Sequence, residues 1–280
     1  MKRLIGREKE IESLEAYVDS GQAEFIAIYG RRRVGKTFLI NQLFRNRLAF
    51  SLTGIIDGTP SEQMESYVQA LEFNGYKINE HPKNWLTAFA ELRKFLQPKI
   101  NSGEPCIVFI DEISCFDSQR SGFVRALGFF WNSWASLQDN LKLIICGSVT
   151  SWMITNIIDS KGGLHNRVTH EIALHQFTLH ETELYLLNRG FNWSRLTILQ
   201  AYMCLGGVPY YLSLLSASES LAENLDRLFF DRDAELQKEY SRLYKTLFKS
   251  PEPYMKIVKL LAVSKQGLTR QEISTKLKIS

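Results

Sequence analysis

The segment Gly30–Thr37 constrains the fold of this chain more than any other part of its sequence. It reads Gly-Arg-Arg-Arg-Val-Gly-Lys-Thr and matches the phosphate-binding pattern G-x-x-x-x-G-K-[ST]. The apolar run 25–29 precedes it and the apolar segment 38–44 follows it, as expected for a strand that enters the loop and a helix that leaves it. The sequence therefore predicts an α/β fold with a nucleotide bound where its first strand ends.

The loop should surround the phosphates with its backbone, because its glycines let the N–H groups turn inward. Lys36 is expected to reach the β and γ phosphates, and the Thr37 hydroxyl to bind Mg²⁺. The helix that follows directs the positive end of its dipole at the same anion. The arginine side chains are expected to face solvent or acidic neighbours. We expect nucleotide contacts from Gly30, Arg31, Arg32, Arg33, Val34, Gly35, Lys36, Thr37 and Phe38.

A second apolar run, 107–110, ends in the carboxylates Asp111 and Glu112. Ligands of open α/β sheets bind at the carboxyl edge of the strands, so both groups should lie beside the phosphate loop. Asp111 is expected to hold Mg²⁺ through water, and Glu112 to act as the base that polarises the attacking water. A solvated acidic turn is the alternative. A glutamate at this position favours hydrolysis over transfer to a small substrate.

Two further polar residues are candidates for catalysis. Ser148 follows the apolar run 143–146 and is expected to contact the γ-phosphate or its water, unless it only caps the next helix. Arg167 precedes the apolar segment 172–174. It is expected to act as an arginine finger supplied by a neighbouring subunit, with an ion pair inside its own chain as the alternative.

Apolar runs alternate with helical patterns up to Phe177, which predicts a mostly parallel sheet with right-handed crossovers. We expect strands at 25–29, 48–52, 106–110, 141–146 and 170–174, and helices at 7–19, 38–44, 60–73, 85–96 and 122–137. Beyond Phe177 only helices are expected, at 178–190, 195–205, 209–216 and 219–230. The predicted domains are a P-loop core at 1–177, a helical lid at 178–236, and a linker helix with an incomplete winged helix at 237–280.

The chain resembles the archaeal-type ATPase family, which is part of the AAA+-related STAND group of signalling NTPases. The resemblance is carried by Ile5-Gly6-Arg7-Glu8, the phosphate loop, Asp111–Glu112, Cys146-Gly147-Ser148 and Gly206-Gly207-Val208-Pro209-Tyr210-Tyr211-Leu212. It implies a core sheet in the order 5-1-4-3-2 followed by a helical lid. It also implies that Ile5, Gly6 and Arg7 lie near the adenine, and that the turn ending at Pro209 closes over the nucleotide.

The C-terminal part of the sequence has a different charge from the rest. Gln237 to Ser280 contains ten Lys/Arg and three Asp/Glu, whereas the whole chain has a net charge of +4. A basic tail favours a polyanion such as DNA, or a solvated helix face. The family resemblance implies a winged helix here, with a first helix at 253–264 and a second opened by the capping box Thr269–Glu272. The sequence ends before a recognition helix.

Together these patterns predict an ATPase that binds ATP and ADP, uses Mg²⁺ and works as a conformational switch. The alternatives are an ATP-regulated DNA-binding protein and a nucleotide-binding scaffold with little turnover. The partners to be expected are a second copy of the chain, and DNA or a protein at the C-terminal region. No apolar stretch approaches the ~18 residues of a membrane span, and the N-terminus has no signal core, so a cytoplasmic location is expected.

Overall fold

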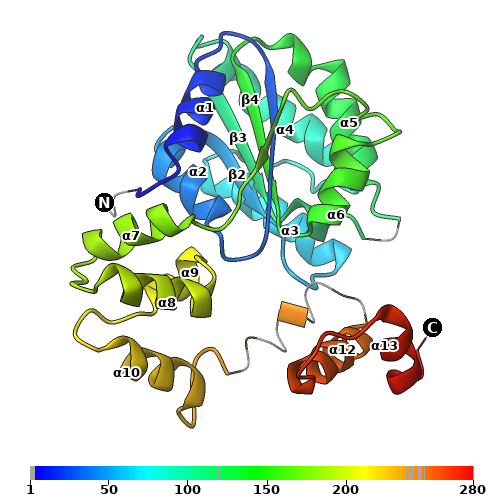
Figure 1. Ribbon diagram of the computed structural model, residues 1–280. Helices are drawn as coiled ribbons and strands as arrows, with labels where there is room; N and C mark the ends of the chain where they lie inside the picture. Colours follow the sequence, from blue (N-terminus) through cyan, green and yellow to red (C-terminus); the bar gives the residue numbers. More distant parts are fainter. Residues whose placement is uncertain are drawn as a thin grey trace. The chain divides into compact units, whose positions relative to one another are not determined.

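A parallel five-stranded sheet forms the centre of the first of two compact units, Met1–Ser213 (Figure 1). The computed structural model describes residues 4–118, 120–237, 239, 243–244, 248 and 250–279. The strands are β1 (Glu24–Tyr29), β2 (Leu48–Thr53), β3 (Cys106–Asp111), β4 (Leu141–Gly147) and β5 (His170–Ala173). They lie in the order β2-β3-β4-β1-β5, and each pairing is parallel. The predicted order 5-1-4-3-2 is confirmed, since it is the same order from the other edge.

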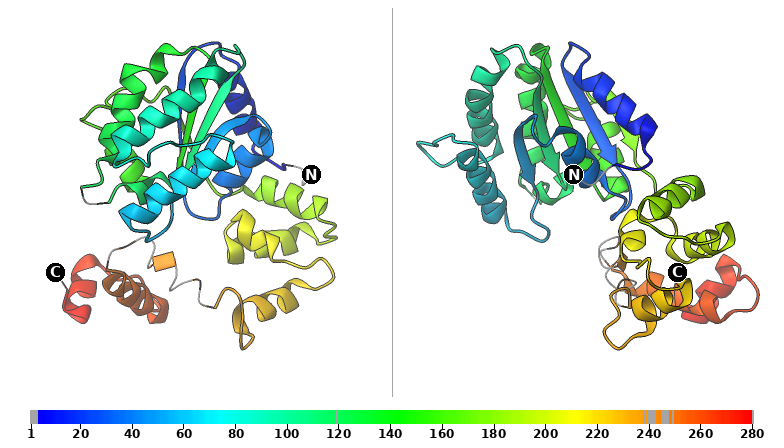
Figure 2. Two further views of the ribbon diagram at one scale, coloured as in Figure 1. Left: turned by 180° about the vertical axis from the view of Figure 1, so that it is seen from behind. Right: turned by 90° about the vertical axis from the view of Figure 1, so that its left-hand side faces the viewer.

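Helices cover both faces of this sheet (Figures 1 and 2). Ile26 and Ile28 of β1 pack in the cluster formed with α1 (Glu8–Val18) and α2 (Lys36–Phe44). The intervening residue Ala27 belongs to the cluster on the opposite face. That face is covered by α3 (Pro60–Phe73), α4 (Trp85–Ile100) and α5 (Phe123–Ser133). Because successive strand residues point to opposite faces, both of which are covered, the strands read as continuous apolar runs.

Helices α4 and α5 end at positions other than those predicted. Helix α4 continues to Ile100 and contains Pro98, whereas the sequence predicts an end at Leu96. The last turn continues because it buries Ile100 in the core. Helix α5 ends at Ser133, because Trp134 leaves the helical conformation at φ −149° and ψ −54° and turns its ring against Phe130. A short 3-10 turn, Ala135–Leu137, covers the rest of the predicted helix.

Beyond β5 the described chain is helical, as predicted. Helices α7 (Leu179–Asn188), α8 (Arg195–Leu205) and α9 (Pro209–Ser213) complete the first unit. Thr178 and Glu181 form the predicted capping box at the start of α7. Arg189 donates to the Leu212 carbonyl at 2.7 Å and so joins the end of α7 to α9. The structure divides into compact units between Ser213 and Leu214. The domain boundaries at 177 and 236 stay predictions.

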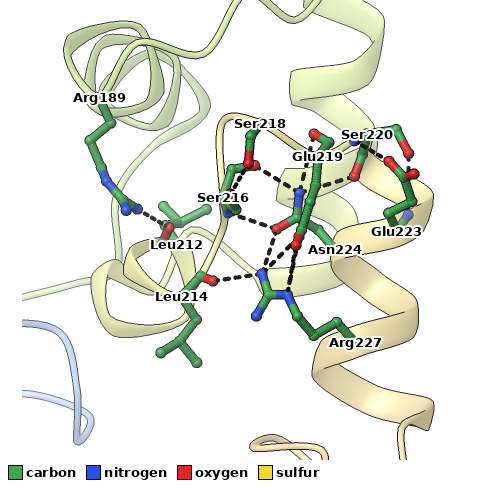
Figure 3. Close-up of polar contacts among 10 residues, drawn as sticks. All are labelled: Arg189, Leu212, Leu214, Ser216, Ser218, Glu219, Ser220, Glu223, Asn224 and Arg227. Atoms are coloured by element: carbon green, nitrogen blue, oxygen red, sulfur yellow. Dashed lines mark hydrogen bonds and ion pairs between the residues drawn. The ribbon is translucent and has the colours of Figure 1, made fainter.

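In the second unit, Leu214–Ser280, side-chain hydrogen bonds fold the turn that precedes α10 (Leu221–Leu225) (Figure 3). Buried Asn224 accepts from the Ser216 N–H at 2.7 Å and donates to the carbonyls of Ser216 and Ser220, both at 3.0 Å. Arg227 donates to the Leu214 carbonyl at 3.1 Å. These bonds replace helical ones, which explains why α9 ends at Ser213 and not at the predicted residue 216.

A short π-helical turn, Asp226–Phe230, follows α10, and the described range 250–279 contains two helices. They are α12 (Glu252–Val263) and α13 (Arg270–Leu277), and Thr269 and Glu272 form the predicted capping box. Neither helix contains a buried residue. Among the described residues, none of the helices combines the length and the apolar character needed to cross a bilayer.

Candidate functional site

The phosphate loop leaves β1 at the carboxyl edge of the sheet and requires glycine at two positions. Gly30 has φ 151°, and a Cβ added there would lie 2.2 Å from the carbonyl oxygen of Leu174, just beyond β5. Gly35 has φ 95° and precedes the first residue of α2. Of the loop arginines, Arg31 is exposed, as expected for a side chain that faces solvent, and Arg32 is half-buried.

Lys36 lies inside the loop, where it is 5% exposed. Its Nζ donates to the carbonyl oxygens of Gly30 at 2.8 Å and Arg31 at 3.1 Å, and to Ser148 Oγ at 3.1 Å. Burial lowers the pKa of Lys36, and the nearby Glu112 carboxylate opposes this shift. The loop therefore holds an ammonium group whose protein contacts a phosphate oxygen can replace.

Thr37 and Asp111 form a pair of oxygen donors beside Lys36. The Thr37 hydroxyl donates to Asp111 Oδ2 at 2.5 Å, and Asp111 Oδ1 accepts from the Glu112 N–H at 2.9 Å. Burial raises the pKa of Asp111, and the hydrogen bond from Thr37 opposes this shift. A hydroxyl and one carboxylate fit Mg²⁺, which takes few protein ligands when phosphate oxygens complete its shell. The described residues contain no group of three or more His, Cys, Asp or Glu that could hold another metal ion.

Ser148 connects the loop to Glu112. Its Oγ accepts from Lys36 and donates to Glu112 Oε1 at 2.7 Å. It does not cap the next helix, because α6 (Thr150–Met153) begins after Val149 and has no side-chain cap. Glu112 has φ 46° and ψ 46°, a left-handed conformation that costs a non-glycine residue roughly 1–2 kcal/mol. Such strain is concentrated at functional sites, where the surrounding structure holds it in place.

The N-terminal segment Ile5–Arg7 lies beside the loop and the start of α7. Gly6 has φ 68°, and a Cβ there would lie 2.9 Å from Glu181 Oε1. Buried Arg7 donates through Nη2 to the Val34 carbonyl at 3.3 Å and also to the His175 carbonyl. Burial lowers the pKa of Arg7, and the carboxylates of Glu181 and Glu10 oppose this shift.

The turn that contains Pro209 also lies against the loop. Gly207 has φ 65°, and a Cβ there would lie 2.3 Å from the Phe177 carbonyl oxygen. Tyr210 N donates to the Arg33 carbonyl at 3.4 Å, and the Arg33 guanidinium lies 4.2 Å from the Tyr210 ring centroid. Arg33 therefore packs on an aromatic ring, a contact that the sequence analysis did not predict. The only sequence signal for this contact is the pair of tyrosines after Pro209.

The structure does not bring Arg167 to the loop of its own chain. This exposed residue precedes β5, which runs parallel to β1. It therefore lies at the amino edge of the sheet, opposite the edge that carries Gly30. Arg167 is in none of the ion pairs between described residues, so the alternative of an ion pair within its chain is not observed. Phe38, in the first turn of α2, is largely exposed.

Comparisons with known proteins agree with this architecture. A family model described as an ATPase domain predominantly from Archaea matches residues 4–215. An uncharacterised protein of Methanocaldococcus jannaschii is 26% identical over 268 residues, which cover 94% of this chain and 55% of the relative. The chain thus spans about half the length of that relative.

Two solved structures share the fold. A Walker-type ATPase of Pyrococcus abyssi is 18% identical with a TM-score of 0.63, and the match covers 98% of this chain and 88% of that one. The ORC2 protein of Aeropyrum pernix, solved in ADPNP–ADP complexes, is 15% identical with a TM-score of 0.62 over 98% of this chain and 80% of that one. At these identities the likeness concerns the fold alone.

Proposed function

The chain belongs to the family of ATPase domains found predominantly in Archaea, and we propose that it hydrolyses ATP to ADP and phosphate with Mg²⁺ as a conformational switch. The observation that carries this proposal is the chain of hydrogen bonds from Lys36 through Ser148 to Glu112. It joins the loop that would hold the phosphates to the carboxylate that would activate water.

The proposed chemistry assigns one task to each of these groups. The Lys36 ammonium exchanges its loop carbonyls for oxygens of the β and γ phosphates. Thr37 and Asp111 would hold Mg²⁺, which neutralises charge on those oxygens. Glu112 accepts a proton from water while the water oxygen bonds to the γ-phosphorus and the bond to the β-phosphate oxygen breaks. Ser148 holds Glu112 Oε1 in place for this transfer.

The contact between Arg33 and Tyr210 supports the switch. Arg33 belongs to the phosphate loop, and Tyr210 belongs to α9 in the segment that follows the turn at Pro209. A change in the loop when the γ-phosphate leaves therefore acts directly on α9. The predicted helical lid begins at residue 178. In this proposal Tyr210 is therefore the lid residue whose contact with the loop changes when ATP is hydrolysed.

The second candidate is an ATP-regulated DNA-binding protein. The observation that favours it is the set of exposed basic side chains on α12, α13 and their flanks: Lys256, Lys259, Lys265, Arg270, Lys276 and Lys278. In this proposal the helices are the start of a winged helix that contacts the phosphate backbone. A third candidate is a scaffold that binds nucleotide without turnover.

Phosphate release by the purified protein, measured with Mg²⁺ or with excess EDTA, separates these functions. The switch predicts basal turnover that requires Mg²⁺ and does not change when duplex DNA is added. Turnover that rises with DNA, and with less effect at higher salt, would favour the DNA-binding regulator. Tight ATP binding without phosphate release would contradict both and leave the scaffold.

We further propose that Arg167 acts in a homo-oligomer, since it lies opposite its own loop. Arg167→Ala should then bind ATP normally and lose turnover, because arginine fingers contribute about 10³–10⁵-fold to hydrolysis. The test mixes this variant with Lys36→Ala, each inactive alone. Hydrolysis should recover, because the first variant supplies an intact nucleotide site and the second an intact arginine. Mixtures that co-assemble by analytical ultracentrifugation yet stay inactive would leave Arg167 with a structural role.

A further inference from the structure

Two successive carbonyl oxygens of the phosphate loop are held by residues outside the loop. The Arg33 carbonyl accepts from Tyr210 N at 3.4 Å, and the Val34 carbonyl accepts from Arg7 Nη2 at 3.3 Å. In a planar trans peptide the C=O and the next N–H point in opposite directions. A bond that holds the Val34 carbonyl outward therefore turns the Gly35 N–H inward, and the bond to Arg33 does the same for the Val34 N–H.

Other contacts of Arg7 fix the position of the guanidinium that donates to the Val34 carbonyl. Its side chain is 6% exposed, and its guanidinium lies 4.9 Å from the centroid of the Phe177 ring. Its main-chain N–H donates to Glu181 Oε1 at 3.2 Å. The backbone at Arg7 has φ 70°, a strained value that these contacts maintain. The guanidinium therefore has a fixed position from which to hold the Val34 carbonyl.

The hydrogen bonds of Arg7 also limit what else it can bind. A guanidinium Nη atom carries two hydrogens, and those of Nη2 are used on the carbonyls of Val34 and His175. Nη1 lies 3.7 Å from Glu10 Oε1. A direct bond from Nη2 to a nucleotide base would require Arg7 to release the carbonyl of Val34 or that of His175, and the released carbonyl would be left without this donor.

We propose that Arg7 is a positioning residue for phosphate binding: by holding the Val34 carbonyl, it aims the Gly35 N–H at the phosphates. This differs from a role in contacting the adenine, which the family resemblance implies for the Ile5–Arg7 segment. The inference rests on the proposed binding of phosphates by Gly30–Thr37.

The test compares ATP with inorganic tripolyphosphate, which has no base. Arg7→Ala should weaken binding of both ligands by the same factor, about 10- to 100-fold, the range for loss of a hydrogen bond to a charged group. Arg7→Lys keeps the charge but cannot copy the planar fork, so it should give a smaller and again equal loss. Glu10→Gln is the matched control, because it removes a contact of Nη1 and leaves the bond to Val34. Its affinities should stay within about twofold of wild type.

A spectroscopic measurement separates positioning from general loss of structure. In protein labelled with ¹⁵N-glycine, tripolyphosphate should shift the Gly35 amide proton of the wild type, and much less that of Arg7→Lys at equal ligand saturation. If Arg7→Ala does not fold, Arg7→Lys alone still tests whether Arg7 positions the Gly35 N–H.

Several outcomes would overturn the inference. One is a loss of affinity for ATP alone in the Arg7 variants, and another is an unchanged affinity of both variants for both ligands. The third is a tripolyphosphate-induced shift of the Gly35 amide proton in Arg7→Lys that equals the shift in the wild type. Failure of the proposed function gives a different result, because Lys36→Ala would then bind tripolyphosphate as the wild type does.

Discussion

Lys36→Ala is expected to reduce ATP affinity by roughly 30-fold to several thousand-fold. This corresponds to the loss of about 2–5 kcal/mol that follows when one partner of a buried, hydrogen-bonded charge pair is truncated. The ammonium group lies within the loop and is held by the carbonyl oxygens of Gly30 and Arg31. These bonds place it where the β and γ phosphates are expected. Alanine removes the principal cation from that position and offers no replacement.

Calorimetric titration with ATP in the presence of Mg²⁺ measures this effect. Lys9→Ala is the matched control, because it removes a lysine from the exposed surface of α1 and should leave the affinity unchanged. Thermal unfolding of the ligand-free variants shows whether either substitution disturbs the fold. Wild-type affinity in a folded Lys36→Ala protein would remove Gly30–Thr37 from the proposed site.

The positions of the loop and of Asp111–Glu112 could be predicted because they depend on local pattern and on one property of parallel sheets. An apolar run that stops at a glycine or at an acidic pair fixes where a strand ends. Parallel strands then bring those ends to the same edge. The structure agrees, since Thr37 and Asp111 are 2.5 Å apart between oxygen atoms. The strand order itself came from the family resemblance and not from these patterns.

The contacts around the loop could not be predicted, because they join residues far apart in the chain. Arg7 meets Val34 and His175, and Arg33 meets Tyr210, only after the sheet and α7–α9 have packed. The left-handed backbone of Glu112 has no signal in the sequence either. The edge on which Arg167 lies follows from the direction of β5, which the local pattern does not give.

The misplaced end of α9 has a similar cause. The apolar pattern continues past Ser213, and by itself it predicts more helix. The side chains of Asn224 and Arg227 instead bind the backbone of the segment that follows (Figure 3). Each of these bonds competes locally with helix formation, and their sum decides the end of α9. A pattern of apolar residues contains no information about such competition.

Glu112→Gln is expected to preserve ATP binding and to slow hydrolysis by about 10²–10⁴-fold, the usual contribution of a general base. The amide has the size of the carboxylate and can still accept the Ser148 hydroxyl hydrogen bond. It cannot accept the proton that the attacking water must lose. The backbone of Glu112 keeps its left-handed conformation, since the side chain beyond Cβ does not determine that strain.

Single-turnover hydrolysis is the decisive measurement, because it reports the chemical step separately from product release. We expect the ATP affinity to stay within about threefold of wild type while this rate falls strongly. That result would mean that the substitution removes an interaction made only in the transition state. Glu171→Gln makes the same chemical change at an exposed position of β5 and should leave the rate unchanged. A rate for Glu112→Gln within twofold of wild type would mean that another group removes the proton. The hydrogen bond from Ser148 to Glu112 would then serve to position the loop lysine and not to align a base.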